Sequence, residues 1–114
     1  MSKWQDKTDF EINKAVAWLN WKGSTVSMSD TSMPMSSCEV CNGNMIVNAN
    51  FDPCNNSSDA WSIILENKIS IEFRYHKSLN PIAKRFGSNS HNIADKNPLR
   101  AAMIVYLEIN GVKP

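Results

Sequence analysis

Two cysteines, Cys38 and Cys41, form the pattern with the clearest chemical potential in this sequence. Thiolates three positions apart can bind the same zinc ion, and Gly43 leaves nearby backbone N–H groups free to donate hydrogen bonds to sulfur. This arrangement is half of a zinc knuckle. Because structural zinc takes four ligands, the pair predicts a metal site only together with further ligands.

Three other residues are candidates for the missing zinc ligands: Cys54, His76 and His91. None has the paired spacing of a second half-site, although two chains can share one ion between their cysteine pairs. A thioredoxin-type redox pair is disfavoured, because that pair begins a helix and no helical pattern follows Cys41. We therefore expect two loop thiols and no cofactor, with zinc at Cys38 and Cys41 as the alternative.

Basic and aromatic residues accumulate in segment 68–86, around the single acid Glu72. The basic residues are Lys68, Arg74, His76, Lys77, Lys84 and Arg85. Cations beside aromatic rings suit nucleic acid or a nucleotide, because cations bind phosphates and rings stack on bases. However, Phe73 and Tyr75 alternate in step with Ile69 and Ile71, which predicts that both rings lie in the core. The basic side chains then belong to the solvated face of a sheet.

Segment 29–44 is predicted to be a flexible, exposed loop, since it is rich in Ser, Thr, Asp and Asn and shows no sustained period. Its methionines have soft, flexible side chains that can adapt to the surface of a partner protein. With the basic segment, the predicted partner-binding set is Met33, Met35, Arg74, His76, Lys77, Lys84 and Arg85.

Recognisable catalytic motifs are not found in the sequence. There is no G-x-S-x-G elbow, and the four glycines form neither a G-x-G-x-x-G loop nor a Walker loop. His76 and His91 are too few for a metal triad. An enzyme that turns over a signalling nucleotide through these histidines is the weakest alternative, and we expect no catalytic residues.

Three helices are predicted from their caps and apolar spacing. The first begins at the capping box that starts with Thr8, the second after Asn56 or Ser57, and the third after Asn97. The apolar face of the second helix is expected to contain Ala60, Trp61, Ile64 and Leu65.

Strands are predicted at 45–50, 69–76 and 82–86, with a shorter one around 25–28. Segment 69–76 alternates strictly between apolar and polar residues, as expected for a sheet with one wet face. The sequence therefore predicts an α+β fold, with three helices packed on a small, mainly antiparallel sheet of three or four strands. Residues 1–114 are expected to form a single domain.

Charge and hydropathy exclude several classes of protein. The chain has twelve Lys and Arg residues and eleven Asp and Glu residues, which gives a net charge of +1. It therefore lacks the overall basic excess that is typical of nucleic-acid-binding proteins. Charges interrupt the first 20 residues and no apolar run can span a membrane, so we expect no leader and no membrane contact. With three cysteines, these features indicate a reducing cytoplasm.

Four segments carry a family resemblance: DFEINKAV at 9–16, DPCNNSSDAWSII at 52–64, ENKISI at 66–71 and DKNPLRAAMIV at 95–105. In this order they resemble the NinX-like family of small phage and prophage accessory proteins. Relatives tend to have proline at the positions of Ser57 and Ser62, a departure that loosens the helix start. The resemblance implies a phage-encoded protein in the cytoplasm of the bacterial host, and no particular chemistry.

These observations favour a non-catalytic function. We expect a phage accessory protein that binds a host protein, with inhibition of a host defence or metabolic system as the purpose. The alternative is a protein that binds nucleic acid or a nucleotide through segment 68–86. The sequence leaves the oligomeric state open.

Overall fold

The computed structural model describes residues 3–21, 25–27, 37–42, 45–73, 79–85 and 92–114 of the 114-residue chain. The helices are a short 3₁₀ helix, η1 (Lys3–Asp6), and the α-helices α1 (Asp9–Asn20), α2 (Ser57–Glu66) and α3 (Pro98–Ile109). The strands are β1 (Thr25–Ser27), β2 (Cys38–Asn42), β3 (Met45–Phe51), β4 (Ile69–Glu72), β5 (Ile82–Arg85) and β6 (Asn92–Ala94).

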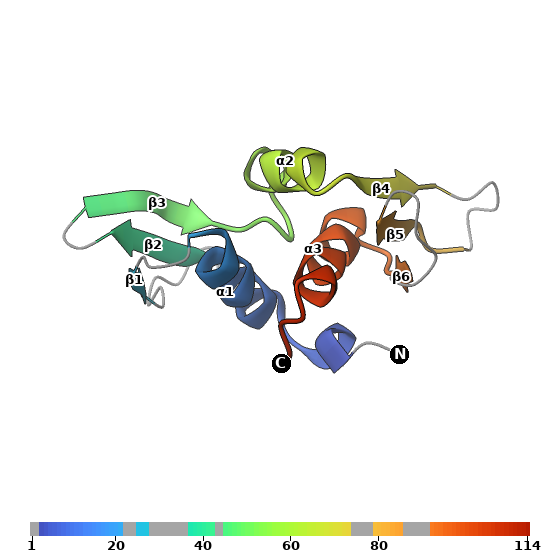
Figure 1. The fold of residues 1–114 in the computed structure, drawn as a ribbon, viewed down its shortest axis with the longest axis horizontal. Coiled ribbons are helices and arrows are strands. Elements are labelled where there is room, and N and C mark those ends of the chain that lie inside the picture. Colours follow the sequence, from blue (N-terminus) through green and yellow to red (C-terminus); the bar gives the residue numbers. More distant parts are fainter. Residues whose placement is uncertain (1–2, 22–24, 28–36, 43–44, 74–78, 86–91) are drawn as a thin grey trace.

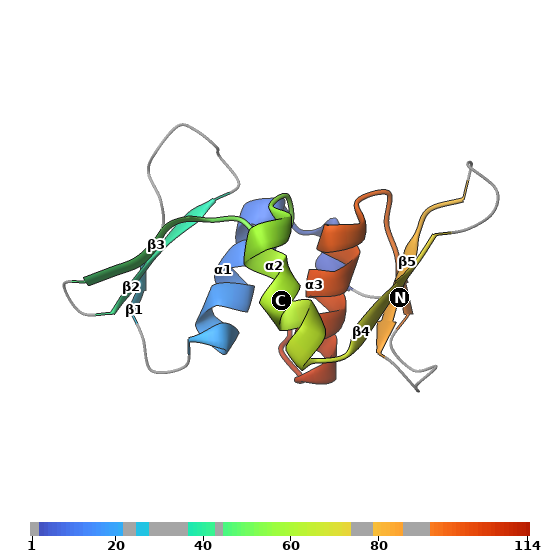
Figure 2. The ribbon, with the colours of Figure 1, turned by 90° about the horizontal axis from the view of Figure 1, so that it is seen from above.

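The strands form two separate antiparallel sheets, with the three α-helices between them (Figure 1 and Figure 2). Sheet A has the order β1-β2-β3, and sheet B has the order β4-β5-β6. The predicted α+β class with three helices is confirmed. The structure has two sheets, whereas one was predicted. After β3 the chain passes through α2 and crosses the helical layer, so β4 begins a new sheet on the far side of α3.

Helix α3 is the centre of the fold. It packs against α1, against α2 and against all three strands of sheet B. Every residue from Ala101 to Leu107 is buried, as expected for a helix that is covered on all sides. The middle of α3, from Ala101 to Leu107, is therefore part of the core.

Strand β2 corrects the prediction of a loop over 29–44. Residues Cys38–Asn42 pair antiparallel with both β1 and β3. Cys38 and Val40, two positions apart, are fully buried on the side that packs against α1. Polar neighbours concealed this short alternation in the sequence, while Met33 and Met35 lie outside the described residues.

The α-helices begin at the caps predicted from the sequence. The Thr8 hydroxyl oxygen accepts a hydrogen bond from the Glu11 N–H at 3.1 Å, and the side chain of Asn56 accepts from Ser58 N–H. Asn97 caps α3 and Pro98 occupies its first position. Local capping chemistry therefore fixes where each α-helix begins.

Candidate functional site

Helix α2 has two apolar faces. Ala60, Ile63 and Ile64 are buried against the core. Trp61 and Leu65, which we expected on the core face, have exposed fractions of 58% and 57%. Positions i and i+4 lie on the same side of a helix, so these two side chains form one apolar stripe that faces solvent.

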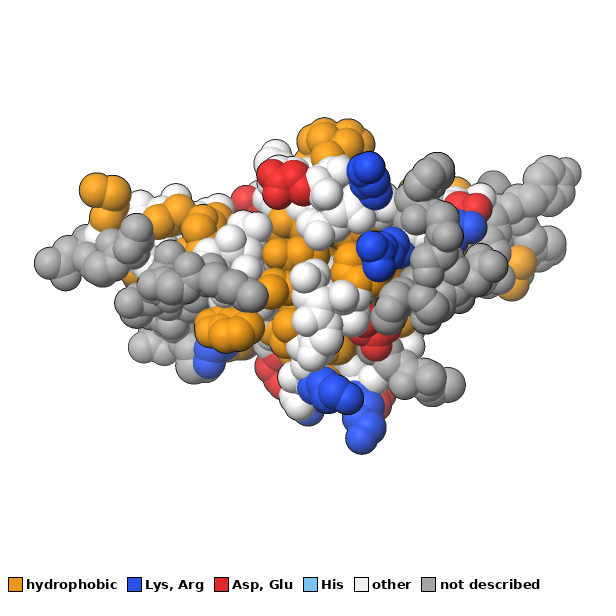
Figure 3. Space-filling view, viewed as in Figure 1, with side chains coloured by type: hydrophobic (Ala, Val, Ile, Leu, Met, Phe, Trp, Pro, Cys, Tyr) orange, Lys and Arg blue, Asp and Glu red, His pale blue; other side chains and the backbone are white. Residues whose placement is uncertain are grey.

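The stripe borders a groove between α2 and β4 with a volume of about 510 Å³. Ile64 and Ile69 are nearly fully buried there, and Ile71 is half-buried. We call this feature the α2–β4 groove, lined by Trp61, Ile64, Leu65, Lys68, Ile69, Ser70 and Ile71. In Figure 2, α2 and β4 diverge from their connecting turn, with α3 beside them. Figure 3 shows apolar side chains over α2, with cationic side chains beside them toward sheet B.

Two cations lie at the end of the groove where α2 joins β4. Lys68 lines both the groove and a second depression of about 330 Å³, which also includes Arg85 and Glu66. Arg85 is opposite Ile69 in the pairing of β4 with β5, so it belongs to the same end of β4 as Lys68. Within the described part of the chain, no carboxylate lies within ion-pair distance of Lys68 or Arg85. With Lys68, Arg85 and Glu66 together, this end of the groove carries a net positive charge.

The turn that joins α2 to β4 has an unusual backbone conformation. Asn67, the residue after the last turn of α2, has a φ of −99°, whereas Lys68 adopts the left-handed conformation with a φ of 53°. The Asn67 side chain donates to the Ile63 carbonyl at 2.8 Å, which closes the last turn of α2. The left-handed turn then redirects the chain into β4 and sets the position of the Lys68 side chain.

A buried polar cluster holds α2 in place from the other end. The amide of Asn13, which is fully buried, donates to Asp52 Oδ1 at 2.6 Å and accepts from the Cys54 N–H at 3.1 Å. Asp59, in the first turn of α2, accepts from the Asp52 N–H at 2.9 Å. These bonds connect α1 to the loop that precedes α2.

Arg100 connects the same region to α3. Its guanidinium donates to Asp9, to Asp95 Oδ2 at 3.1 Å, and to the backbone carbonyls of Gln5 and Lys7 at 3.0 and 2.7 Å. Only 13% of its side chain is exposed. The planar guanidinium group has five N–H donors and bonds to all four of these acceptor groups, whereas a lysine ammonium has only three donors.

Two asparagines complete the cluster. Asn55 donates to Asp9 Oδ2 at 3.1 Å, and Asn97 donates to Asn55 Oδ1 at 3.2 Å and to the Cys54 carbonyl at 2.7 Å. The starts of α1, α2 and α3 therefore meet here. No buried side-chain nitrogen or oxygen among the described residues lacks a hydrogen-bond partner. The cluster thus uses its polar groups to hold the helices together.

The cysteines are not arranged as a zinc site within the described residues. Cys38 is fully buried, whereas Cys41 is partly exposed and its thiol donates to Glu39 Oε1 at 3.4 Å. Burial, and then Asp52 and Asp59, raise the pKa of Cys38 to about 11, which opposes the thiolate that zinc requires. No group of three or more His, Cys, Asp or Glu side chains is placed to hold a metal ion in this part of the chain. His76 and His91 lie outside it.

The structure describes two of the predicted partner-binding residues, Lys84 and Arg85. Arg85 is exposed at the cationic end of the groove, but Lys84 points to the other face of sheet B and pairs with Glu72 at 3.2 Å. Arg74, His76 and Lys77 lie outside the described residues, as do Met33 and Met35. Phe73, which we expected in the core, is 74% exposed, because β4 already ends at Glu72.

Sequence reasoning assigned Trp61 and Leu65 to the wrong face of α2. A signal was available: Ala60, Ile63 and Ile64 have the i, i+3, i+4 spacing of a core-facing stripe by themselves. Once this stripe is assigned to the core, Trp61 and Leu65 remain as a second stripe.

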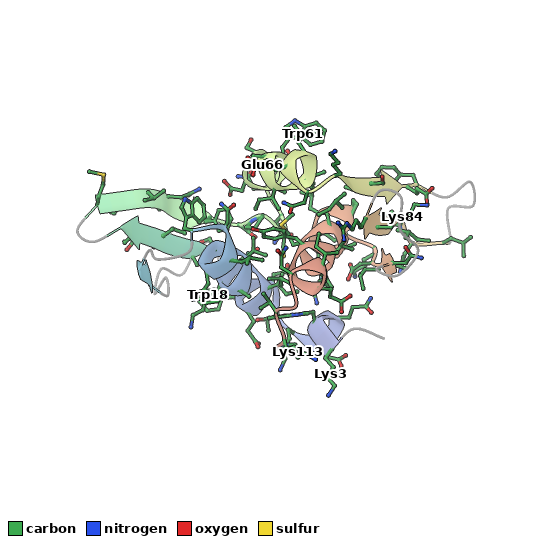
Figure 4. The ribbon with its side chains drawn as sticks, viewed as in Figure 1. Lys3, Trp18, Trp61, Glu66, Lys84 and Lys113 are labelled. Atoms are coloured by element: carbon green, nitrogen blue, oxygen red, sulfur yellow. The ribbon has the colours of Figure 1, made fainter. Side chains whose placement is uncertain are left out.

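A second groove of about 430 Å³ offers a comparison on a different side of the molecule. It includes Trp4, which is buried, and Trp18, which is 55% exposed, with Lys7, Lys14 and Lys113 among its cations. Figure 4 shows Trp18 and Lys113 well away from Trp61. Trp18 therefore matches Trp61 in residue type and exposure, but it is not part of the α2–β4 groove.

Comparison with known protein families relates this chain to a phage family. No curated protein and no solved structure matches the chain. No helix among the described residues combines the length and apolar character needed to cross a membrane. The family described as "Bacteriophage P22, NinX" matches residues 3–109, which include the four segments noted in the sequence, the polar cluster and the α2–β4 groove. The chain therefore belongs to the bacteriophage P22 NinX family.

Proposed function

We propose that this phage protein is a non-catalytic accessory protein that binds a host protein through the α2–β4 groove, in the cytoplasm of the bacterial host. The observation that supports the proposal is the exposed apolar stripe of Trp61 and Leu65 beside the groove. Tryptophan is enriched among the residues that carry binding energy in protein interfaces. An aromatic anchor beside an apolar groove is a typical feature of such an interface.

The chemistry of the groove favours binding over catalysis. Its described lining contains no histidine, cysteine or carboxylate, and its ionisable group is Lys68. The polar cluster on the other side of α2 is used to hold the helices together. A protein with this surface affects its partner by occupying a surface of it, which suits an inhibitor of a host defence or metabolic system.

A capture experiment with matched variants tests the proposal. The tagged protein is incubated with nuclease-treated bacterial lysate, and the captured proteins are identified by mass spectrometry. We expect one host protein in stoichiometric amount, strongly reduced with Trp61→Ala and retained with Trp18→Ala. Both tryptophans are more than half exposed, so both variants should fold.

Two results would overturn the proposal. One is that no host protein is captured in stoichiometric amount. The other is that Trp18→Ala and Trp61→Ala reduce capture equally, because the α2–β4 groove would then not be the specific surface.

Nucleic-acid or nucleotide binding remains a second candidate because of Phe73. Its ring is 74% exposed, so the objection that it lies in the core no longer holds, and Arg85 is exposed on the neighbouring strand. Anisotropy of a labelled single-stranded oligonucleotide tests this candidate. Binding that weakens as salt rises, and that Phe73→Ala and Arg85→Ala both reduce, would favour it over the host-protein proposal.

A further inference from the structure

Strand β4 is an edge strand that runs along the α2–β4 groove. In sheet B it pairs with β5 on one side, and the described residues place no strand on its other side. Alternate backbone N–H and C=O groups of an antiparallel strand point away from its partner, so β4 presents some of these groups outward. In Figure 1, β4 lies above β5, and its outer edge and α2 are on the same side of the molecule.

An unpaired strand edge is a template for another strand. A strand added to β4 would lie about 4.8 Å from it, and its alternate side chains would point to opposite faces of sheet B. On one of these faces are α3 and the α2–β4 groove, with Trp61 and Leu65 exposed and Ile69 and Ile71 near its base. Apolar side chains at alternate positions of the added strand would fill this groove.

The charges define an orientation for the occupant. Lys68 and Arg85 lie at the Ile69 end of β4. Glu66 lines the depression beside them, but among the described residues no carboxylate is within ion-pair distance of either cation, so this end is net positive. At the other end, Glu72 pairs with Lys84. An occupant therefore gains most from carboxylates placed beside Ile69 and from no charge beside Glu72. Exposed charges of this kind contribute modestly to affinity but select the partner and its direction.

We infer that the α2–β4 groove binds an extended segment of a partner protein, which adds to β4 as a fourth strand of sheet B. This segment has apolar residues at alternate positions and acidic residues at the end that lies beside Lys68 and Arg85. The inference rests on the proposed function for the biological partner, but the binding chemistry belongs to the groove itself. Main-chain hydrogen bonds supply affinity in this mode, and the side-chain pockets supply specificity.

The test selects peptides from a random 12-residue display library against the purified full-length protein. Selected peptides are expected to alternate apolar residues and to carry Asp or Glu near one end. In the complex, hydrogen exchange of the backbone amides in 69–72 should slow at least tenfold. Methylation of alternate peptide backbone nitrogens should weaken binding at least tenfold, since it removes the donors that a strand edge requires.

Charge variants provide the matched control. Arg85→Glu should weaken binding of the acidic peptides several-fold. Lys113→Glu makes the same reversal of charge beside the Trp18 groove and should leave binding within twofold. Recovery of no binding peptide, of peptides without acidic residues, or of peptides that protect residues other than 69–72 would overturn the inference. Self-association through β4 in sedimentation, or salt-dependent oligonucleotide binding that protects 69–72, would also overturn it by naming another occupant.

The two proposals can fail separately. A host protein captured in a Trp61-dependent manner, with unprotected amides at 69–72, would contradict strand addition and leave host binding intact. Acidic peptides that protect 69–72, together with a lysate that yields no partner, would support the groove chemistry and contradict the host-protein proposal.

Discussion

Lys68 combines a strained backbone with a charge at the mouth of the groove. A non-glycine residue at a φ of 53° costs about 1–2 kcal/mol relative to a right-handed conformation, and glycine avoids most of this cost. Glycine also makes the unfolded chain more flexible, which offsets about 0.4–1 kcal/mol. We predict that Lys68→Gly raises the free energy of unfolding by about 0.5–1 kcal/mol in urea titrations but weakens binding of acidic peptides.

Two other variants separate these contributions. Lys68→Asn introduces a residue that tolerates the left-handed conformation and removes the charge. It should therefore weaken binding of acidic peptides without a large change in stability. Gly111→Ala meets no atom within 4 Å but imposes a φ of 72° on alanine, so it should lower stability by about 1 kcal/mol. A destabilised Lys68→Gly variant would contradict the role of backbone strain.

The three thiols should differ in reactivity. Cys38 and Cys54 are fully buried, whereas Cys41 is partly exposed, so we predict that a maleimide reagent modifies Cys41 first. Cys38 and Cys54 should react only when the protein unfolds. Mass spectrometry after brief labelling, with and without denaturant, measures this order, and rapid native labelling of Cys38 would contradict the structure.

The buried thiols also predict a loss of stability in alkaline solution. Burial raises the pKa of Cys38 from 9.0 to about 11, and raises that of Cys54 further. Above pH 9 the unfolded chain releases thiol protons that the native state retains. The free energy of unfolding should therefore fall as pH rises from 9 toward 11, by up to about 1.4 kcal/mol per pH unit for each thiol.

Urea titrations at pH 8, 9 and 10 measure this slope. Cys38→Ala and Cys54→Ala should each flatten it, although each also leaves a small cavity. A slope that neither variant alters would assign the alkaline loss to other groups.

At the level of elements, the polar cluster determines how the helices meet. Arg100 bonds to two carboxylates and two backbone carbonyls, and its side chain is 13% exposed. Removing one partner of a largely buried charged network leaves the others uncompensated, at a cost of about 3 kcal/mol. We predict that Arg100→Met lowers the free energy of unfolding by about this amount.

A matched substitution tests whether the network is responsible. Lys113→Met removes a cation from an exposed position and should change stability by less than about 0.5 kcal/mol. Arg100→Lys should recover only part of the loss, because lysine cannot bond to all four groups. Equal stability of Arg100→Met and the wild type would show that the cluster does not hold the helices together.

At the level of elements, the sequence predicted where helices begin better than it predicted which elements pack against each other. Caps such as Asn56 and Asn97 act within a few residues, and they fixed the starts of α2 and α3. The buried face of α2 depends on which elements pack against it. Its sequence contains two overlapping apolar stripes, one with Ile63 and one with Trp61, and their spacing alone did not decide between them. Strand β2 was missed because its burial comes from α1, which is distant along the chain.

At the scale of the whole molecule, two sheets flank a helical centre. A single sheet was expected because strands close in sequence usually pair, but α2 separates β3 from β4 and α3 lies between the sheets. This arrangement leaves β4 as an edge beside α2 and so creates the α2–β4 groove. The site therefore arises from the topology. Of the two predicted partner-binding residues that the structure describes, Arg85 lies beside the groove and Lys84 points to the other face of sheet B.

The central claim is that this groove is the surface through which the protein binds its partner. The most direct measurement is the affinity of the captured host protein, once purified, for the Trp61→Ala and Trp18→Ala variants. An interface anchor contributes about 2 kcal/mol or more, so Trp61→Ala should weaken binding about 30-fold while Trp18→Ala stays within twofold of the wild type. Equal affinity of the two variants, or a larger loss with Trp18→Ala, would contradict the account.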